Sequence, residues 1–421
     1  MSQERRGPRV AYLVQQFTPE VGAGPARVSE MAARWSRAGA MVTVVTAMPN
    51  RPEGRIHSSY RGRLFALEEG DGIRVLRSWL YARPGGGLLT TLLNNVSFLF
   101  TSLLLLLRQA GPIDVLIASS PPWFPHIGGT WFSRWRGVPL VLEVRDLWPD
   151  YLVEMGIVRH PWVVRALLGY ERRLLLRADH VVVVTEGLRQ RVLAKGIPSD
   201  RVTLITNGVD PAQYYPSTES TTLPELQKSP GEFLVGYLGN FGAGQSLGCV
   251  LEAAGLLRGT HPQVRFVLVG DGTEYPRIRA MAERLALPNV ALHGVIPKEE
   301  TRAFYNACDL CLVPLAALPV FEGALPSKMF EMMACGRPVL AQSTGEAALH
   351  LARSGAGWSV APGDASALAG AIGRIAGMSP EERHTAGAGG VEYVGRHFNR
   401  DALAARFLEV LRALSSVGRR R

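Results

Sequence analysis

Two glutamates and a lysine near residue 325 carry side chains that could bind a ligand. Lys328 and Glu331 are three residues apart, so they would share one face of a helix. Pro326 suits the first turn of that helix, whose free N–H groups and positive dipole favour a diphosphate. Lys328 would add charge, Glu331 would accept hydrogen bonds from two ribose hydroxyls, and Glu322 would hold sugar hydroxyls. The alternative is a capped helix with an ordinary ion pair.

Loops with glycine or exposed backbone follow three predicted strands in the second half of the chain. Glycine allows a phosphate to approach backbone N–H groups closely. No Arg or Lys lies between Leu238 and Val250, so Lys328 would supply much of the positive charge. For Asp271 a local cap of the strand-to-helix turn is an equal alternative. The candidate residues are Gly239, Asn240, Gln245, Gly270, Asp271, Gly272 and Val295.

Three loops in the first half of the chain hold further candidates. Gly22 and Gly24 follow the first strand and open a helix, where a phosphate could approach the backbone. Arg145 and Asp146 leave a strand, and Asp146 could orient an acceptor hydroxyl as a base or cap the next turn. His126 follows a proline-rich loop and is either a site residue or a structural histidine.

Short β-branched runs alternate with helical stretches and form the scaffold for these loops. This alternation predicts parallel sheets covered on both faces, with ligands at the carboxyl ends of strands. We therefore predict an α/β protein with two Rossmann-like domains whose sheets face each other across a cleft. Predicted strands are 10–14, 42–46, 73–76, 115–118, 141–144, 181–184, 202–205, 234–237, 266–269, 290–293, 310–313 and 339–341, and predicted helices include 27–37 and 162–177.

The chain has 421 residues, which is too long for one typical core. Four prolines between residues 211 and 232 break the alternation and indicate a linker. The predicted domains are 1–210, which would bind the acceptor, and 233–398, which would bind the donor. Residues 399–421 would form a C-terminal helix at 401–414 and a basic end, Arg419–Arg421.

Charge and hydropathy narrow the partners. Lys and Arg exceed Asp and Glu by ten, which suits a diphosphate or an anionic membrane, and no nucleic-acid-binding module is recognisable. The apolar stretch 88–107 is long enough to span a bilayer, but Asn94 and Asn95 interrupt it. Its helical spacing favours an amphipathic or buried helix, and one lying in the membrane interface is the functional version.

The cysteine and histidine pattern gives no support for a metal or another cofactor. Four cysteines imply no disulfide framework, which fits a reducing cytoplasm. Cys308 and Cys311 form a lone pair without a second pair or a nearby histidine, so ordinary packing is expected. Carboxylates with metal-ligand spacing are also lacking, and we expect neither a required metal nor a cofactor.

Several segments together resemble glycosyltransferase family 4, whose members have the two-domain GT-B fold. The resemblance implies a nucleotide-diphosphate sugar donor, transfer with retention at the anomeric carbon, and electrostatic stabilisation of the leaving diphosphate. It places Gly323, Ala324, Leu325 and Pro326 at the donor, and Arg145, Asp146, Glu322 and Lys328 at the reacting groups. The segments are 17–25, 145–150, 206–210, 237–242, 269–272 and 321–338.

This chain departs from the family pattern at two places. Glu322 and Glu331 have eight residues between them instead of seven, so the assignment of Glu322 is less secure. Arg145 stands where many members have a histidine that contacts the 6-hydroxyl of the donor sugar, which predicts a 6-deoxy sugar. The motifs at 147–149 and 326–328 resemble the bacterial branch similar to L-fucosamine transferases of surface-polysaccharide assembly.

The resemblance also implies an acceptor and a location. The acceptor would be a polyprenyl-linked sugar or another saccharide, the donor base would be uracil, and the protein would bind peripherally to the inner face of the cell membrane. Two other functions are compatible with the sequence: a nucleotide-sugar epimerase of the same fold, and a non-catalytic, membrane-bound, sugar-binding subunit. Intact Lys328 and Glu331 argue against the second of these.

Overall fold

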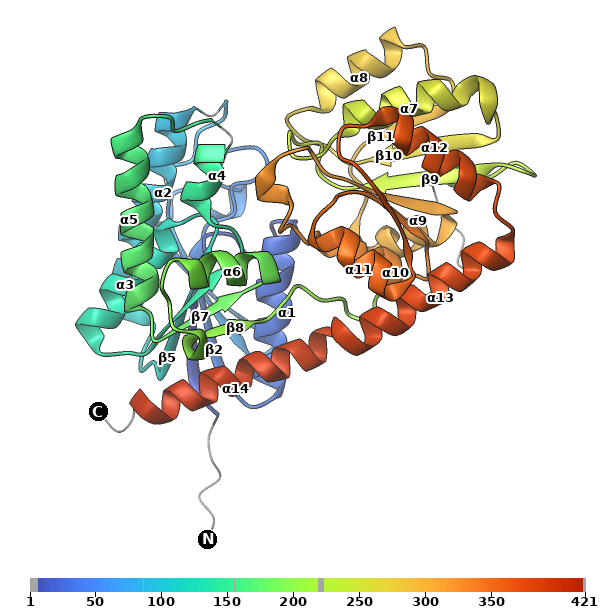
Figure 1. Ribbon diagram of the computed structural model, residues 1–421. Helices are drawn as coiled ribbons and strands as arrows, with labels where there is room; N and C mark the ends of the chain where they lie inside the picture. Colours follow the sequence, from blue (N-terminus) through green and yellow to red (C-terminus); the bar gives the residue numbers. More distant parts are fainter. Residues whose placement is uncertain (1–6, 86, 155, 219–222, 419–421) are drawn as a thin grey trace. The chain divides into compact units, whose positions relative to one another are not determined.

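Two compact α/β units make up the protein (Figure 1). The computed structural model describes residues 7–85, 87–154, 156–218 and 223–418. The first unit runs to Thr206 and resumes at Arg400, and the second unit is Asn207–Asn399. Each has a largely parallel sheet with helices on both faces, which confirms the predicted fold class. The predicted basic end, Arg419–Arg421, lies outside the described residues.

The first unit contains an eight-stranded sheet. Its strands are β1 (Arg9–Leu13), β2 (Met41–Ala47), β3 (Phe65–Gly70), β4 (Ile73–Ser78), β5 (Val115–Ser120), β6 (Leu140–Val144), β7 (His180–Val183) and β8 (Val202–Leu204). Its helices are α1 (Ala23–Arg37), α2 (Leu88–Gln109), α3 (Phe124–Arg136), α4 (Trp148–Glu154), α5 (Pro161–Arg177), α6 (Glu186–Ala194) and α14 (Arg400–Gly418). The strand order is β3-β4-β2-β1-β5-β6-β7-β8, and β3 alone pairs in antiparallel orientation.

Alternation along the central strand builds two cores in this unit. Val10 and Tyr12 of β1 pack with α1 and α14 on one face of the sheet. Ala11 and Leu13 pack with α2, α3 and α5 on the other face. Strand β3 was not predicted, because an antiparallel edge strand with one solvated face needs no continuous apolar run.

The second unit contains a six-stranded sheet with all neighbours parallel, in the order β11-β10-β9-β12-β13-β14. Its strands are β9 (Phe233–Leu238), β10 (Val264–Val269), β11 (Val290–His293), β12 (Leu310–Pro314), β13 (Val339–Gln342) and β14 (Gly357–Val360). Its helices are α7 (Leu247–Thr260), α8 (Tyr275–Arg284), α9 (Thr301–Ala307), α10 (Ser327–Ala334), α11 (Glu346–Ser354), α12 (Ala365–Ala376) and α13 (Pro380–His397). Strand β14 was missed because its four residues are at best half-buried.

The division between the units differs from the predicted one at both crossings. The segment 211–232, predicted as a linker, belongs to the second unit: Leu223 and Leu226 are buried in its core, and Arg265 donates a hydrogen bond to the carbonyl oxygen of Gln227 at 2.7 Å. Apolar leucines among the prolines explain this packing. The C-terminal helix α14 belongs to the first unit, where Trp35 Nε1 donates to the carbonyl oxygen of Ala404 at 3.0 Å.

Candidate active site

The loops after β9 and β10 in the second unit touch each other through their backbones. A Cβ atom on Gly270 would lie 1.9 Å from the carbonyl oxygen of Gly239, and one on Gly272 would lie 2.5 Å from Asn240 Oδ1. These positions therefore admit only glycine. Asp271 Oδ1 accepts a hydrogen bond from the N–H of Gly272 at 2.7 Å, which is the local cap that was the alternative interpretation.

Lys328 lies against the first of these loops. Its Nζ donates a hydrogen bond to Gln245 Oε1 at 3.2 Å and lies 4.0 Å from the centroid of the Tyr237 ring. A Cβ on Gly239 would come within 3.1 Å of Nζ, so the ammonium group borders the glycine loop. Burial lowers the pKa of Lys328 to about 7, against the opposing charge of Glu331. The ammonium group thus donates to the neutral side chain of Gln245, and an approaching anion would raise the pKa of Lys328 and favour its charged form.

Glu331 lies one turn further along α10, and its carboxylate faces a tyrosine. Tyr305 donates a hydroxyl hydrogen bond to Glu331 Oε2 at 3.2 Å. Burial raises the pKa of Glu331 to about 7, while Tyr305, Lys298 and Lys328 act in the opposite direction. The side chain is half-buried, so oxygen lone pairs remain for hydroxyl donors of a ligand.

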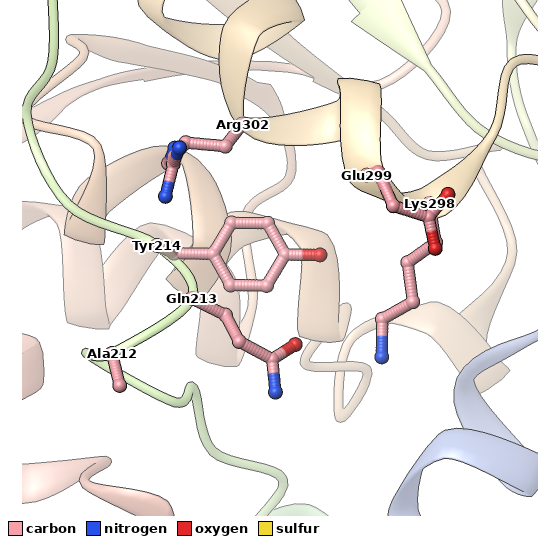
Figure 2. Close-up of a pocket in the computed structure, with 6 residues that line it drawn as sticks. All are labelled: Ala212, Gln213, Tyr214, Lys298, Glu299 and Arg302. Carbon is pink, nitrogen blue, oxygen red and sulfur yellow. The ribbon is translucent and has the colours of Figure 1, made fainter.

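A cavity of about 400 Å³ lies in the second unit, and Figure 2 shows the side chains that line it. Tyr214 lines it with its hydroxyl directed towards the side of Lys298, and Arg302 lies at the other side of the ring. The negative charge of Glu331 contributes to the raised pKa of Tyr214, although burial is the main cause, so the two groups are close. The other lining residues are Ala212, Gln213 and Glu299.

The segment around Glu322 is anchored by its backbone. The carbonyl oxygen of Glu322 accepts a hydrogen bond from the N–H of Glu346 at 2.7 Å, and a Cβ on Gly345 would lie 1.9 Å from the same oxygen. The Glu322 side chain is exposed and therefore accessible to a ligand. Gly323, Ala324 and Leu325 then lead to Pro326, which is the N-cap of α10 and not part of its first turn as expected. Val295 is exposed after β11.

Arg145 in the first unit lies across the start of α1. Its Nε donates to the carbonyl oxygen of Ser120 at 2.7 Å, and Nη2 donates to that of Pro121 at 3.2 Å. A Cβ on Gly24 would lie 2.5 Å from Arg145 Nη1. Gly24 is therefore required for the guanidinium group to approach the helix start, and Gly22 at φ 140° is its N-cap. The structure thus brings together Gly22, Gly24 and Arg145.

A fully buried glutamate one strand position before this loop organises the same region. Glu143 accepts hydrogen bonds from Tyr12 at 2.6 Å, Ser119 at 2.6 Å and Arg27 Nε at 2.9 Å. Arg27 also donates to the carbonyl oxygens of Ile205 and Thr206, at 2.9 and 2.7 Å. Burial would raise the pKa of Glu143, but the charges of Arg27 and Arg145 and the two hydroxyl donors hold it below its usual value.

Asp146 and His126 have different surroundings. The Asp146 side chain is exposed, yet the dense protein around it raises the pKa of its carboxyl to about 6, with Arg145 opposing. His126 is buried, and its Nε2 lies 3.1 Å from the carbonyl oxygen of Glu143. Burial lowers the pKa of His126 to about 4, so the ring is neutral at pH 7. His126 therefore fits the structural alternative: it supports the strand that ends at the loop of Arg145 and Asp146.

Sequence reasoning missed several polar groups near the candidate site. Tyr237 and Tyr305 lie within a strand and a helix that read as ordinary core elements, so no pattern marked their hydroxyl groups. Lys298 stands four residues beyond Gly294. Its place in the loop after strand β11, where ligands of parallel sheets bind, was a signal in the sequence that could have marked it. Among residues 7–85, 87–154, 156–218 and 223–418, no three His, Cys, Asp or Glu side chains gather as metal ligands.

Two family models and several known proteins match this chain. A family model described as a glycosyl transferase 4-like domain matches residues 22–208, and one described as glycosyl transferases group 1 matches residues 232–377. WcaI of Escherichia coli (strain K12), assigned to colanic acid biosynthesis as a glycosyl transferase, is 25% identical over 327 residues, which cover 76% of this chain and 79% of that protein.

Solved structures show the same fold. Sucrose-phosphate synthase from Thermosynechococcus elongatus superposes with a TM-score of 0.77 at 22% identity, over 97% of this chain and 100% of that chain. Anabaena HepE, in complex with UDP and glucose, gives a TM-score of 0.71 at 19% identity, over 96% and 99% of the two chains. The chain is a glycosyltransferase with the GT-B fold, built from a glycosyl transferase 4-like domain followed by a group 1 domain.

Proposed function

We propose that this enzyme is a retaining glycosyltransferase of surface-polysaccharide assembly, which transfers a sugar from a UDP-linked donor to a lipid-linked or saccharide acceptor. The arrangement of Lys328 and Gln245 beside Glu331 at the start of α10 is the observation that carries the proposal, because it offers a cation, a helix N-terminus without a side-chain cap and a carboxylate in one unit. WcaI supports the polysaccharide context by its assignment, and the UDP bound to HepE supports the donor base.

In this proposal each residue of the second unit has one role. Lys328 and the start of α10 stabilise the charge that develops on the leaving diphosphate. Glu331 accepts hydrogen bonds from the ribose hydroxyls, and Glu322 from hydroxyls of the transferred sugar. Gly239 has no side chain beside Lys328 Nζ, so a phosphate can approach the ammonium group there, and Gly270 and Gly272 let the neighbouring loop pack against this one.

The first unit supplies the acceptor side of the proposed reaction. The acceptor hydroxyl oxygen bonds to the anomeric carbon as the bond from that carbon to the diphosphate oxygen breaks, on the same face of the sugar. The hydroxyl proton passes to the departing phosphate oxygen. Because the acceptor attacks the anomeric carbon directly, no protein nucleophile is required. Asp146 orients the acceptor hydroxyl, and Arg145 with Gly22 and Gly24 holds an anionic group of the acceptor or donor.

The proposed sugar is an N-acetylated 6-deoxy amino sugar. The resemblance to L-fucosamine transferases supports the amino sugar, and the same resemblance implies that Arg145 replaces a histidine that contacts a 6-hydroxyl, which supports a 6-deoxy sugar. A lipid-linked acceptor would place the reaction at the cytoplasmic face of the cell membrane, with the protein bound peripherally. Comparing turnover of 6-deoxy and 6-hydroxy donors tests the first point, and preference for a 6-hydroxy donor would refute it.

The proposal is tested by incubating the protein with UDP-, GDP- and dTDP-sugars and reading transfer or hydrolysis by mass spectrometry. We expect release of UDP from at least one UDP-sugar and loss of that release in the Lys328→Ala variant. Proton NMR of the product should show the anomeric configuration of the donor. Turnover without any acceptor to an isomeric nucleotide sugar would instead identify an epimerase, and an inverted product would exclude retention.

A further inference from the structure

The outer face of α2 is apolar, and its exposed part runs from Leu88 to Phe100, because Leu103 and Leu107 pack against the core of the first unit. Residues 89, 92, 93, 96, 100, 103, 104 and 107 recur at helical spacing on one side of this helix, and all are Leu, Val or Phe. Leu88, Leu89, Leu92, Leu93 and Phe100 are between 42% and 78% exposed. A helix at the surface of a water-soluble unit normally presents polar residues there, so this face has the composition of a buried surface.

Helix α2 is long and apolar enough to cross a membrane. Its connection to two strands of one sheet, however, excludes a membrane-spanning orientation. It connects β4 to β5, and both strands lie in the same sheet, in the order β4-β2-β1-β5. A spanning helix would separate these strands by a bilayer. The inner face of α2 is also occupied, since Asn95, Phe98, Ser102 and Leu105 are buried. The fold therefore does not allow α2 to span a membrane.

Tryptophans flank the apolar face on both sides. On one side the segment after β4 runs along α2, where Thr101 Oγ1 donates to the carbonyl oxygen of Trp79 at 2.6 Å. On the other side α3 packs against α2, and a Cβ on Gly128 would lie 3.0 Å from Leu99 Cδ1. Helix α3 exposes Trp131 and Trp135 to 43% and 68%. Tryptophan prefers the boundary between hydrocarbon and lipid headgroups.

The positive charge of the first unit favours an anionic surface as the partner of the apolar face of α2. Between Asp71 and Glu143 the single carboxylate is Asp114, which pairs with Arg9 at 2.6 Å, whereas six arginines occur in that stretch. The first unit contains 32 Lys and Arg and 18 Asp and Glu, a net charge of +14, and the second contains 14 and 18, a net charge of −4. Two copies of this positively charged unit would repel each other, whereas an anionic bilayer would attract the unit.

We propose that α2 and the exposed end of α3 dock on an anionic lipid bilayer, with the outer face of α2 in the headgroup region and parallel to the membrane. Arg108, Arg134 and Arg136, which are exposed at the C-terminal ends of these helices, contact lipid phosphates. This inference extends the proposed function by giving a lipid-linked acceptor a surface beside the enzyme. It is tested without turnover, so its failure would leave the transferase proposal standing.

The experiment is co-sedimentation of the full chain with vesicles of phosphatidylcholine, with and without phosphatidylglycerol. We expect binding to the anionic vesicles that is weakened by salt, and little binding to phosphatidylcholine alone. The double variant Leu89→Gln and Phe100→Gln should lower the partition coefficient by roughly tenfold or more, because two exposed apolar side chains lose their burial in lipid. Arg134→Gln with Arg136→Gln should lower it roughly tenfold.

Matched controls come from the second unit. Leu256→Gln with Leu349→Gln removes two side chains of similar exposure, 52% and 55%, and should leave vesicle binding unchanged. Circular dichroism melting confirms that each variant is folded. Equal vesicle binding by Leu89→Gln/Phe100→Gln and the wild type would overturn the proposal. So would a wild-type dimer in sedimentation velocity that this variant converts to monomers, because a second copy would then cover the face.

Discussion

The two units differ in how well their buried charged side chains are hydrogen-bonded. In the first unit Glu143 is buried with three hydrogen-bond donors, and its pKa is held low. In the second unit Lys328 donates a hydrogen bond to Gln245 and Glu331 accepts one from Tyr305, and burial moves the pKa of each to about 7. A satisfied buried charge fixes a loop, whereas an under-satisfied one is ready for a ligand. We therefore interpret the first network as structural and propose the second as the binding site.

The largest effect should follow from breaking the first network. Replacing Glu143 by Leu leaves the Arg27 guanidinium buried without its carboxylate, which should cost about 3–5 kcal/mol in the free energy of unfolding. Urea denaturation followed by circular dichroism measures this. Arg279→Ala, which removes an exposed pair with Glu283, should leave the midpoint nearly unchanged. If both variants lose the same stability, the Glu143 network does not carry this role.

The next largest effect concerns the contact between Gly24 and Arg145. In the Gly24→Ala variant the new Cβ would displace the guanidinium group, and kcat/KM should fall roughly 10- to 100-fold with the melting temperature preserved. Gly169→Ala is the control, because a Cβ there meets no atom within 4 Å. Wild-type kcat/KM in Gly24→Ala would show that the position of Arg145 does not matter for turnover.

The second network predicts a bell-shaped pH dependence of donor binding. Below pH 7 Glu331 gains a proton and ceases to be a pure acceptor, and above pH 7 Lys328 loses its charge, so affinity for a nucleotide sugar should be greatest near pH 7. Calorimetric titration from pH 5.5 to 8.5, an interval chosen to span roughly 1.5 units on each side, measures it. Lys328→Arg should remove the fall on the alkaline side, because guanidinium stays protonated. A fall of unchanged size in that variant would contradict the assignment.

A smaller effect is expected from the tyrosine that supports Glu331. Tyr305→Phe removes the hydroxyl donor to Glu331, so donor affinity should fall roughly 3- to 10-fold and the acidic limb of the profile should move to higher pH. Tyr393→Phe, which removes a hydroxyl that lies 2.8 Å from His350 Nδ1, is the control and should bind donor normally. An unshifted acidic limb in Tyr305→Phe would show that this hydrogen bond does not set the protonation of Glu331.

The parallel sheets and the order of their strands along the chain could be predicted from the sequence, because buried parallel strands are continuous apolar runs. Strand β3 could not be predicted, because its residues are partly exposed. The packing of 211–232 could not be predicted either, because Leu223 and Leu226 are isolated apolar residues in a proline-rich segment. Lys328 and Glu331 were predicted because spacing of three on a helix fixes their shared face. Tyr305 and the contact of Gly24 with Arg145 depend on tertiary approach, for which local pattern has no signal.

In the proposed function Lys328 binds the diphosphate of the donor. The most direct test compares the nucleoside diphosphate of the active donor with its nucleoside, titrated into wild type and Lys328→Ala by calorimetry at pH 7. We expect the dissociation constant of the diphosphate to rise roughly 10- to 100-fold in the variant, while that of the nucleoside does not change. An unchanged dissociation constant for the diphosphate, or an equal loss for both ligands, would contradict it.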